Sequence, residues 1–360
     1  MAPIVPPSLP APRVTVVIPC FNYGHYLPRC IDTILEQPDV TADVLIVDDA
    51  STDGSGDVAE RLAGERPRVR VIRHARNAGH IATYNDGLAE VTGDYVVLLS
   101  ADDLLTPGSL ARSTSLLEAH PTVGMVYGHA VRFSGAEPPR ARTESTSWTI
   151  WSGIDWLNTR FRLGRNCIFS PEVVLRTSVQ REIGGYRSDL PHSGDLEMWL
   201  RAAAVADVGY VTGADQAWYR VHAENMHTTV FQSGELDGMV GDLRERLAAF
   251  ELAAERMGGR MTDTGALVMD ARRAIAIEGL NLAIRSYHWG MSDVWPVHDL
   301  AALATEIYPA ATRLPQFQIL CLRRRGGTLG RRQDPLSVGH EIVLKARELS
   351  RDWRWARAGL

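Results

Sequence analysis

The sequence predicts an α/β fold in which a mostly parallel sheet is flanked by helices and followed by a C-terminal helical region. Over residues 14–133, short apolar and β-branched segments alternate with helical stretches at the spacing of β-α-β units. After about residue 230 the strand pattern stops and long helical periodicities take over. A chain of 360 residues, 45% hydrophobic and 22% charged, has room for one large or two smaller globular domains.

The first part of the chain divides into alternating strands and helices. The predicted strands are Val14–Ile18, Val44–Val47, Val69–Ile72, Tyr95–Leu99 and Val123–Phe133. The predicted helices between them are His25–Gln37, Asp57–Ala63, Ile81–Val91 and Pro107–His120. Crossover connections of this kind bring the loops that follow the parallel strands to one edge of the sheet, where ligands usually bind.

The rest of the chain is less regular at first and then helical. Gly135–Trp148 is rich in Pro, Arg, Ser and Thr, and we expect it to be the most mobile loop of the front half. From Trp151 to Arg220 the pattern is mixed α/β, with a helix around Leu196–Ala204. Later helices are predicted at Leu236–Met257, Gly265–Trp289, Asp293–Ile307 and Pro335–Arg357. We therefore expect a mobile Pro-rich tail at 1–13, an α/β domain at 14–230, and a helical region at 231–360.

Charge and cysteine content exclude several classes of protein. The chain has 38 basic and 43 acidic residues, a net charge of −5, which is not the basic footprint of a nucleic-acid-binding protein. Its 4 cysteines form no CxxC pair, so neither a zinc ribbon nor a disulfide framework is indicated. No apolar run approaches the ~20 residues that span a bilayer, and the start lacks the pattern of a signal peptide. We expect a cytoplasmic protein.

The net charge conceals an uneven distribution. Residues 310–360 contain eleven basic and four acidic side chains, so this end carries +7 and the remainder −12. A solvated surface that pairs with the acidic body is the simpler interpretation. Peripheral contact with an anionic membrane, at the inner face, is the alternative. Homo-oligomer formation through the C-terminal helices is a further possibility.

Two pairs of carboxylates follow predicted strands. Asp48 and Asp49 end the second strand, and Asp102 and Asp103 end the fourth, so we expect all of them in one crevice. Hard oxygen ligands suit Mg²⁺ or Mn²⁺, which take substrate phosphates as remaining ligands. The turn after the first strand, from Pro19 to Tyr23, has no glycine-rich phosphate loop, which argues against a P-loop enzyme and a dinucleotide dehydrogenase. Each acidic pair taken alone could simply cap a helix.

Four segments, in this order and spacing, resemble the motifs of the family-2 glycosyltransferases of GT-A fold. They are Val-Val-Ile-Pro-Cys-Phe-Asn (16–22), Val-Asp-Asp-Ala-Ser-Thr-Asp-Gly-Ser (47–55), Arg-Asn-Ala-Gly (76–79) and Leu-Ser-Ala-Asp-Asp (99–103). The resemblance extends over roughly residues 14–225. It implies a nucleotide-sugar donor, favoured as UDP- or dTDP-type, and a metal-dependent, inverting hexosyl or N-acetylhexosaminyl transfer. It also implies a donor half at 14–106 and an acceptor half at 107–230.

The resemblance further implies roles for residues of the donor half. The nucleotide-sugar would be bound by Pro19, Phe21, Asp49, Gly79, Asn85 and Asp102. Within this set, Asp49 would accept the N3–H of a uracil- or thymine-type base, and Asp102 would lie near the ribose. Asp103 would hold Mg²⁺ or Mn²⁺, although Ser-Ala-Asp-Asp departs from a strict Asp-x-Asp and leaves the choice of carboxylate open. Where the family often has Ala-Arg-Asn, this chain has Ala-Thr-Tyr-Asn at 82–85, and His80 is the candidate substitute for the missing arginine.

Two later segments complete the resemblance. In His192-Ser-Gly-Asp-Leu-Glu-Met-Trp-Leu-Arg201, Asp195 matches the general base that takes the proton of the acceptor hydroxyl, and Glu197 is the alternative base. Asp195 opens a helix, whose dipole stabilises its charge, so a raised pKa would have to come from burial. In Tyr219-Arg-Val-His222, the histidine matches a third metal or diphosphate ligand, with His227 as its competitor. The turn Gly184-Gly185-Tyr186 resembles an element that is mainly architectural.

The acceptor is defined only by its hydroxyl group, on a small-molecule scaffold, a saccharide or a cell-envelope precursor. Four tryptophans are candidates for a stacking wall in the acceptor half, although at least half of them are expected in the core: Trp148, Trp151, Trp156 and Trp218. Two alternatives are a nucleotidyltransferase of related sheet topology and a degenerate, non-catalytic nucleotide-sugar-binding protein. The first usually has a glycine-rich basic loop that is missing here. The second is disfavoured because all the expected carboxylates are present.

Overall fold

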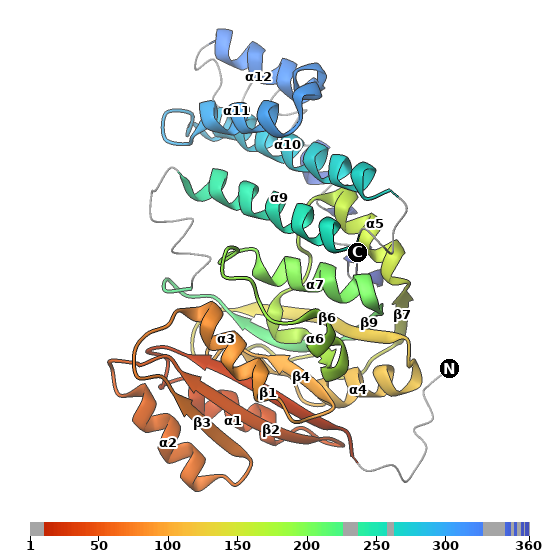
Figure 1. Cartoon of the computed structure of the whole chain (residues 1–360). Helices are drawn as coiled ribbons and strands as arrows, with labels where there is room; N and C mark the ends of the chain where they lie inside the picture. Colours follow the sequence, from red (N-terminus) through yellow and green to blue (C-terminus); the bar gives the residue numbers. More distant parts are fainter. Residues whose placement is uncertain are drawn as a thin grey trace. The chain divides into compact units, whose positions relative to one another are not determined.

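The computed structural model describes residues 11–225, 237–257 and 263–326, together with short pieces of 343–359. Contacts within the chain divide it into two units. The first contains the residues up to 156, then 167–222 and 356–359, and the second contains 157–166 and 223–355. Figure 1 shows the α/β organisation of the first unit and the helical composition of the second.

The first unit is built on a mixed sheet with strand order β3-β2-β1-β4-β8-β6-β9-β5, to which β7 is added through β9. Four strands run parallel: β1 (Arg13–Cys20), β2 (Thr41–Asp48), β3 (Val69–Arg73) and β4 (Tyr95–Leu98). The antiparallel β8 (Val174–Arg176) connects β4 to β6 (Val123–Phe133), and β6 runs parallel to β9 (Asp207–Arg220). Two more strands pair antiparallel with β9, namely β5 (Leu104–Leu105) and β7 (Ser147–Trp151). The predicted mostly parallel sheet is confirmed.

Helices cover both faces of this sheet (Figure 1). Val14, Val16 and Ile18 of β1 face a core that includes residues of α1 (Leu27–Leu35), α2 (Ser55–Glu65) and α4 (Ser109–Ala119). The intervening Val17 faces the other side, where it lies against Gly87 of α3 (His80–Ala89). Residue alternation along a strand therefore supplies both layers. The remaining helical elements of this unit are the 3₁₀ turn η1 (Ser170–Glu172), α6 (Thr177–Ile183) and α7 (Gly194–Val205). Helix α5 (Gly153–Leu163) begins in the first unit, and its residues from Leu157 onward belong to the second.

The second unit is helical, as predicted. Its long helices are α9 (Asp237–Met257), α10 (Thr264–Trp289) and α11 (Val297–Ile307), followed by η2 (Pro309–Arg313) and α12 (Pro315–Gly326). Asp263 caps α10 by accepting a hydrogen bond from the amide of Ala266 at 2.9 Å, and Gly290 ends it in the left-handed region. Helix α12 was not predicted. Most of the predicted helix Pro335–Arg357 lies outside the described residues.

No helix in the described part of the chain is long and apolar enough to cross a membrane.

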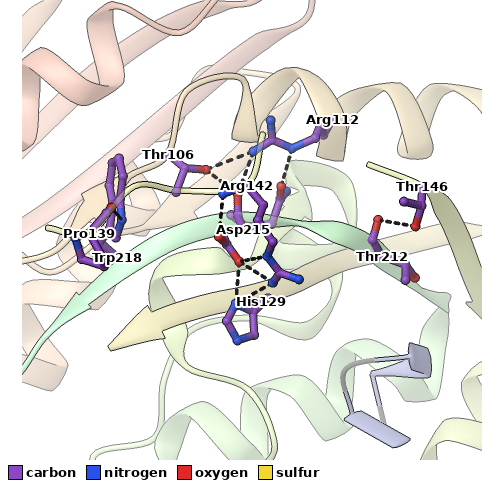
Figure 2. Close-up of polar contacts among 10 residues, drawn as sticks. Thr106, Arg112, His129, Pro139, Arg142, Thr146, Thr212, Asp215 and Trp218 are labelled. Atoms are coloured by element: carbon purple, nitrogen blue, oxygen red, sulfur yellow. Dashed lines mark hydrogen bonds and ion pairs between the residues drawn. The ribbon is translucent and has the colours of Figure 1, made fainter. Parts of the chain in front are cut away.

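The segment between β6 and β7 differs from its prediction as a mobile loop. Its last two predicted residues, Ser147 and Trp148, belong to β7. Residues of neighbouring elements form hydrogen bonds to several positions between Gly135 and Thr146, and Figure 2 shows some of these contacts. The contacts are Arg220 Nη1 to Gly135 O (2.5 Å), Trp218 Nε1 to Pro139 O (2.9 Å), Arg112 Nη1 to Thr143 O (2.9 Å) and Thr146 N to Thr212 O (2.9 Å). Composition predicted a loop correctly but carried no information on these long-range donors.

A buried carboxylate holds the middle of this loop. Both oxygens of Asp215 in β9 accept hydrogen bonds from Arg142, one from its backbone amide at 2.7 Å and the other from its guanidinium at 2.5 Å. His129 of β6 lies 2.7 Å from the same carboxylate through Nδ1 (Figure 2). Burial alone would raise the pKa of Asp215, but these hydrogen bonds outweigh it and lower the pKa below its ordinary value. The loop is therefore attached to the sheet through a charged group.

Candidate active site

The loops after β1 and β2 are joined to each other. Asn22, in the left-handed region with φ of 60°, donates its backbone amide to Ser51 Oγ at 2.9 Å. Its side-chain oxygen in turn accepts from the amide of Thr52 at 2.9 Å. Pro19 belongs to β1 and pairs with β2, while Phe21 lies on the loop with 45% of its surface exposed. Phe21 is thus a large apolar side chain available to a ligand at this edge of the sheet.

Asp49 is the buried anchor of the donor side. Its Oδ1 accepts from the amide of Ala78 at 2.7 Å and lies 2.8 Å from Nδ1 of His74, and its Oδ2 accepts from the amide of Gly79 at 2.9 Å. Burial raises the pKa of Asp49, but the bonds from Ala78, His74 and Gly79 outweigh burial and lower it. Asp49 therefore remains charged at neutral pH and ties the Arg-Asn-Ala-Gly loop to the end of β2.

The second carboxylate pair divides into two environments. Oδ2 of Asp102 lies 2.9 Å from Nε2 of His222, whereas Oδ1 of Asp103 accepts the backbone amide of Arg220 at 2.8 Å. The guanidinium of Arg220 also donates to the backbone oxygen of Asp102 at 2.9 Å. Burial, and then the charge of Asp102, raise the pKa of Asp103. The sequence left open which carboxylate would hold the metal. The structure places His222 beside Asp102, while the backbone amide of Arg220 engages Asp103.

Aromatic rings surround this pair. The ring of His222 lies edge-on to Tyr23 with a centroid distance of 5.7 Å, and 5.9 Å from the ring of Tyr26. The guanidinium of Arg220 lies 4.9 Å from the centroid of Tyr26, within the range of a cation–π contact. The histidine is therefore packed in place by residues that follow β1. The competing His227 lies outside the described residues.

Asp102 and His222 are suited to bind a hard divalent cation whose other ligands come from water and from a substrate. Across the described residues no group of three or more His, Cys, Asp or Glu side chains could hold a metal ion by itself. Asp102 and His222 supply one carboxylate oxygen and one imidazole nitrogen at a mutual distance of 2.9 Å. Magnesium and manganese sites of nucleotide-dependent enzymes typically combine one or two such ligands with water and substrate phosphates. The pair fits that pattern.

Asp195 lies in the first turn of α7 and is held by two hydroxyl groups. Ser170 Oγ donates to Oδ2, and Tyr186 Oη donates to Oδ1 at 2.8 Å. Burial raises the pKa of Asp195, and the two hydroxyl donors oppose that rise without cancelling it. The sequence argument required burial as the source of a raised pKa, and burial is the largest cause here. Asp195 therefore has a higher proton affinity than an ordinary aspartate.

Glu197, the alternative base, is engaged elsewhere. It is fully buried and forms an ion pair with Arg201, whose Nε lies 2.8 Å from each carboxylate oxygen. Arg201 also donates to the backbone oxygen of Gly185 at 2.8 Å. Both carboxylate oxygens of Glu197 thus accept hydrogen bonds from one guanidinium inside the protein. Its role is to fix the turn between α6 and α7.

Asn85 and His80 make contacts that the sequence did not predict. The side-chain oxygen of Asn85 accepts the amide of Tyr186 at 2.6 Å, and its amide group donates to Tyr186 O at 2.9 Å. Nε2 of His80 lies 2.9 Å from the backbone oxygen of Pro191. We expected both residues on the donor side. Instead their polar groups bind the segment before α7, so α3 connects the donor half to Asp195.

The donor-side carboxylates and Asp195 belong to one electrostatic neighbourhood. Burial raises the pKa of Tyr84, and the charges of Asp195 and Asp102 raise it further. Burial, followed by Asp103 and Asp102 and with a smaller contribution from Asp195, raises the pKa of Tyr219 to about 12. The charges of both sets of carboxylates thus raise the pKa of one tyrosine on α3 and of one on β9.

A protein-family model for "Glycosyl transferase family 2" matches residues 15–177, the stretch that carries Asp49, Asp102 and the segment before α6. Residues 15–177 of the chain therefore form a family-2 glycosyltransferase domain.

Several proteins match parts of the chain. An uncharacterized protein of Mycobacterium tuberculosis is 28% identical over 56% of this chain and 65% of its own length. An uncharacterized glycosyltransferase of Nostoc is 35% identical over 32% of this chain and 36% of its own length. The chain thus spans less than two thirds of these relatives. Among solved structures, TarS 1-349 of S. aureus matches 84% of this chain and 90% of that chain, with a TM-score of 0.52 and 15% identity, which shows the fold.

Three contacts of the candidate site were missed from the sequence. His74 stands three residues before the Asn-Ala-Gly of the donor loop, and its proximity to that motif was the signal that could have identified it as the partner of Asp49. Tyr186 was assigned an architectural role, yet its hydroxyl binds Asp195. Ser170 lies in no motif, and no pattern in the sequence marked it.

The candidate tryptophan wall is largely structural. Trp156 is fully buried and donates to Tyr127 Oη at 3.1 Å. Trp151 donates to the backbone oxygen of Ala358 at 2.9 Å, and Trp218 donates to Pro139. Trp148 packs edge-on against His120, with ring centroids 5.8 Å apart. The indole N–H groups of three of these four residues therefore serve the protein itself.

Proposed function

We propose that the protein is an inverting glycosyltransferase that moves a hexosyl or N-acetylhexosaminyl group from a UDP- or dTDP-sugar to an acceptor hydroxyl. The proposal rests mainly on one observation, the contrast between two carboxylate environments that lie close enough to influence the same tyrosines. Asp102 is paired with His222, while Asp195 is held by neutral hydroxyls and has a raised pKa. The first environment suits a diphosphate–metal group and the second suits proton transfer.

The nucleotide would bind at the ends of β1 and β2. Asp49 keeps its charge and has one donor on Oδ2, the amide of Gly79, so this oxygen retains acceptor capacity for the N3–H of a uracil or thymine ring. The exposed Phe21 would lie against the base. S. aureus TarS, whose fold this chain shares, has been solved with UDP-GlcNAc, which supports a uridine donor.

Asp102 and His222 would hold the divalent cation, so this proposal moves the metal role from Asp103 to Asp102. Asp103 instead accepts the amide of Arg220, which joins the turn before β5 to the end of β9. When bound, the cation would neutralise the negative charge that develops on the departing diphosphate. The protein's own contribution is to present one carboxylate oxygen and one imidazole nitrogen at that position.

Asp195 would act as the general base. It would take the proton of the acceptor hydroxyl while the acceptor oxygen forms a bond to the anomeric carbon. The bond from that carbon to the diphosphate oxygen breaks, and its electron pair leaves with the nucleotide. Attack from the side opposite the leaving group inverts the anomeric centre. The acceptor would be a small-molecule scaffold, a saccharide or a cell-envelope precursor that carries the hydroxyl.

The proposal is tested with the full chain and a panel of UDP-glucose, UDP-N-acetylglucosamine and dTDP-glucose. Release of UDP or dTDP is measured with Mn²⁺ and with EDTA, and with water or added saccharides as acceptors. We expect release that depends on the cation and on Asp195. Binding of a donor without turnover would indicate a non-catalytic binding protein, and release of pyrophosphate from a nucleoside triphosphate and a sugar phosphate would indicate a nucleotidyltransferase.

A further inference from the structure

Both oxygens of Asp195 receive one hydrogen bond, and the two donors come from separate segments. Ser170 belongs to η1 and reaches Oδ2, whereas Tyr186 follows α6 and reaches Oδ1 at 2.8 Å. A carboxylate held by one donor can still rotate about its terminal bond. Two donors on opposite oxygens fix the plane of the group.

The Tyr186 donor is itself held in place. Its backbone amide and backbone oxygen are both bound by the side chain of Asn85, at 2.6 and 2.9 Å. Its ring lies edge-on to Tyr84 with a centroid distance of 5.2 Å, and the residue is buried. The position of Tyr186 is thus set by its contacts with α3.

The Ser170 donor is fixed by a short local structure. The amide of Phe169 donates to Oε1 of Glu172 at 2.8 Å, and the amide of Val173 donates to Ser170 O at 3.2 Å. The ring of Phe169 packs against Tyr219 of β9 at a centroid distance of 5.3 Å. The turn η1 therefore presents Ser170 from the sheet while Tyr186 approaches from the helical side.

We propose that Ser170 and Tyr186 are positioning residues, whose hydroxyls hold the carboxylate of Asp195 in the orientation that receives the acceptor proton. This inference rests on the proposed function, in which Asp195 is the base. Each carboxylate oxygen has two lone pairs, and each donor uses one of them. One lone pair per oxygen stays free for the acceptor hydroxyl. The hydroxyls also favour the charged carboxylate and so keep part of the base unprotonated in the free protein.

Several other groups face Asp195 and set its proton affinity. His80 lowers its pKa through its charge. Tyr84, Tyr219 and the buried Glu172 lie near enough for the charge of Asp195 to raise their own pKa values. None of these four groups makes a hydrogen bond to Asp195 among the described residues. Tyr84 therefore offers a matched control, because Tyr84→Phe removes a nearby hydroxyl that does not touch the carboxylate.

The first test measures the proton affinity of Asp195 without any substrate. The full chain is labelled with ¹³C at aspartate carboxyl groups, and the Asp195 resonance is identified by its loss in Asp195→Asn. We expect Ser170→Ala and Tyr186→Phe each to raise the pKa of Asp195 by about one pH unit, because each removes a donor to the charged form. Ser170→Thr, which keeps the hydroxyl, should restore the original value, and Tyr84→Phe should leave it in place. An unchanged titration in both Ser170→Ala and Tyr186→Phe overturns the proposal.

The second test uses nucleotide release from UDP-N-acetylglucosamine and UDP-glucose. We expect kcat to fall about tenfold in Ser170→Ala and in Tyr186→Phe, with the acidic limb of its pH profile moved upward and the donor KM unchanged. If Asp195→Asn abolishes release while these variants match the wild type, Asp195 remains the proposed base and the positioning role of Ser170 and Tyr186 is wrong. If Asp195→Asn retains full release, the proposed function has failed at the base itself, and the positioning proposal falls with it.

Discussion

Asp49, which is buried after β2, and Asp195, which is partly buried in the first turn of α7, have environments that act in opposite directions. Around Asp49, two backbone amides and a histidine outweigh burial, and the pKa falls. Around Asp195, two neutral hydroxyls do not outweigh burial, and the pKa rises. Burial is the largest influence on both carboxylates, so the number and kind of donors decide the outcome.

The difference matches what each position would have to do. A carboxylate that accepts from a nucleobase must stay charged, and rigid amides of the Ala78-Gly79 loop guarantee that at neutral pH. A general base must accept a proton during the reaction and therefore needs a pKa closer to the pH at which the enzyme works. Two of the three partners of Asp49 are backbone amides, which substitution cannot remove. Both partners of Asp195 are side-chain hydroxyls, which substitution can remove one at a time.

Loss of the base should have the largest effect. Asp195→Asn keeps the shape of the side chain but cannot take the acceptor proton, so we expect nucleotide-sugar turnover to fall about 10³-fold with the donor KM little changed. Nucleotide release measured in the same preparation as donor binding checks this. Asp189→Asn is a suitable control, because Asp189 is exposed, pairs with Arg187 and lies on the same segment. A variant that loses binding and turnover together would place Asp195 in the donor site instead.

Removal of the histidine should have the next largest effect. We expect His222→Ala to reduce turnover about 100-fold and to increase the Mn²⁺ concentration that half-saturates the rate, since Asp102 would lose its partner ligand. His129→Ala is the matched control, because His129 also lies against a buried carboxylate, at 2.7 Å from Asp215. Equal Mn²⁺ dependence in both variants would show that His222 is no ligand.

Weakening the donor side should have a smaller and different effect. In Asp49→Asn the side-chain amide faces the amides of Ala78 and Gly79, and the charge is lost. We expect the donor KM to rise about tenfold while kcat stays near that of the wild type, the reverse of the Asp195→Asn pattern. Initial rates over a range of donor concentrations measure both constants. A fall in kcat without a change in KM would remove Asp49 from the nucleotide site.

The parts predicted correctly are those that regular structure determines. Asp49 and Asp102 were located because each follows an apolar strand, and parallel strands end at a common edge. The choice between Asp102 and Asp103 could not be made from the sequence because the two are adjacent, and the backbone amide of Arg220 is what distinguishes them in the structure. Ser170 was missed because it is 25 residues from Asp195 and in a turn of three residues with no periodicity of its own. Contacts that depend on one hydroxyl at long range leave no pattern in a single sequence.

The same limit applies to the loop between β6 and β7, which was expected to be mobile. A substitution at its anchor, Asp215, should have a small effect on turnover. Asp215→Asn removes the charge that binds Arg142 and His129, while transfer should change less than in any preceding variant. We expect a loss of about 2 kcal/mol in unfolding free energy at neutral pH, from charged hydrogen bonds to a buried group. Urea unfolding at several pH values measures it.

The pH dependence of that loss follows from the lowered pKa of Asp215. A carboxylate whose pKa is lower in the folded than in the unfolded protein stabilises the fold above its ordinary pKa of 3.8, and this contribution disappears as pH falls through the folded value. The stability difference between the wild type and Asp215→Asn should therefore be constant near neutrality and shrink below about pH 4. A difference that grows on acidification would mean that Asp215 is uncharged in the folded protein, and that the loop is attached by neutral hydrogen bonds instead of an ion pair.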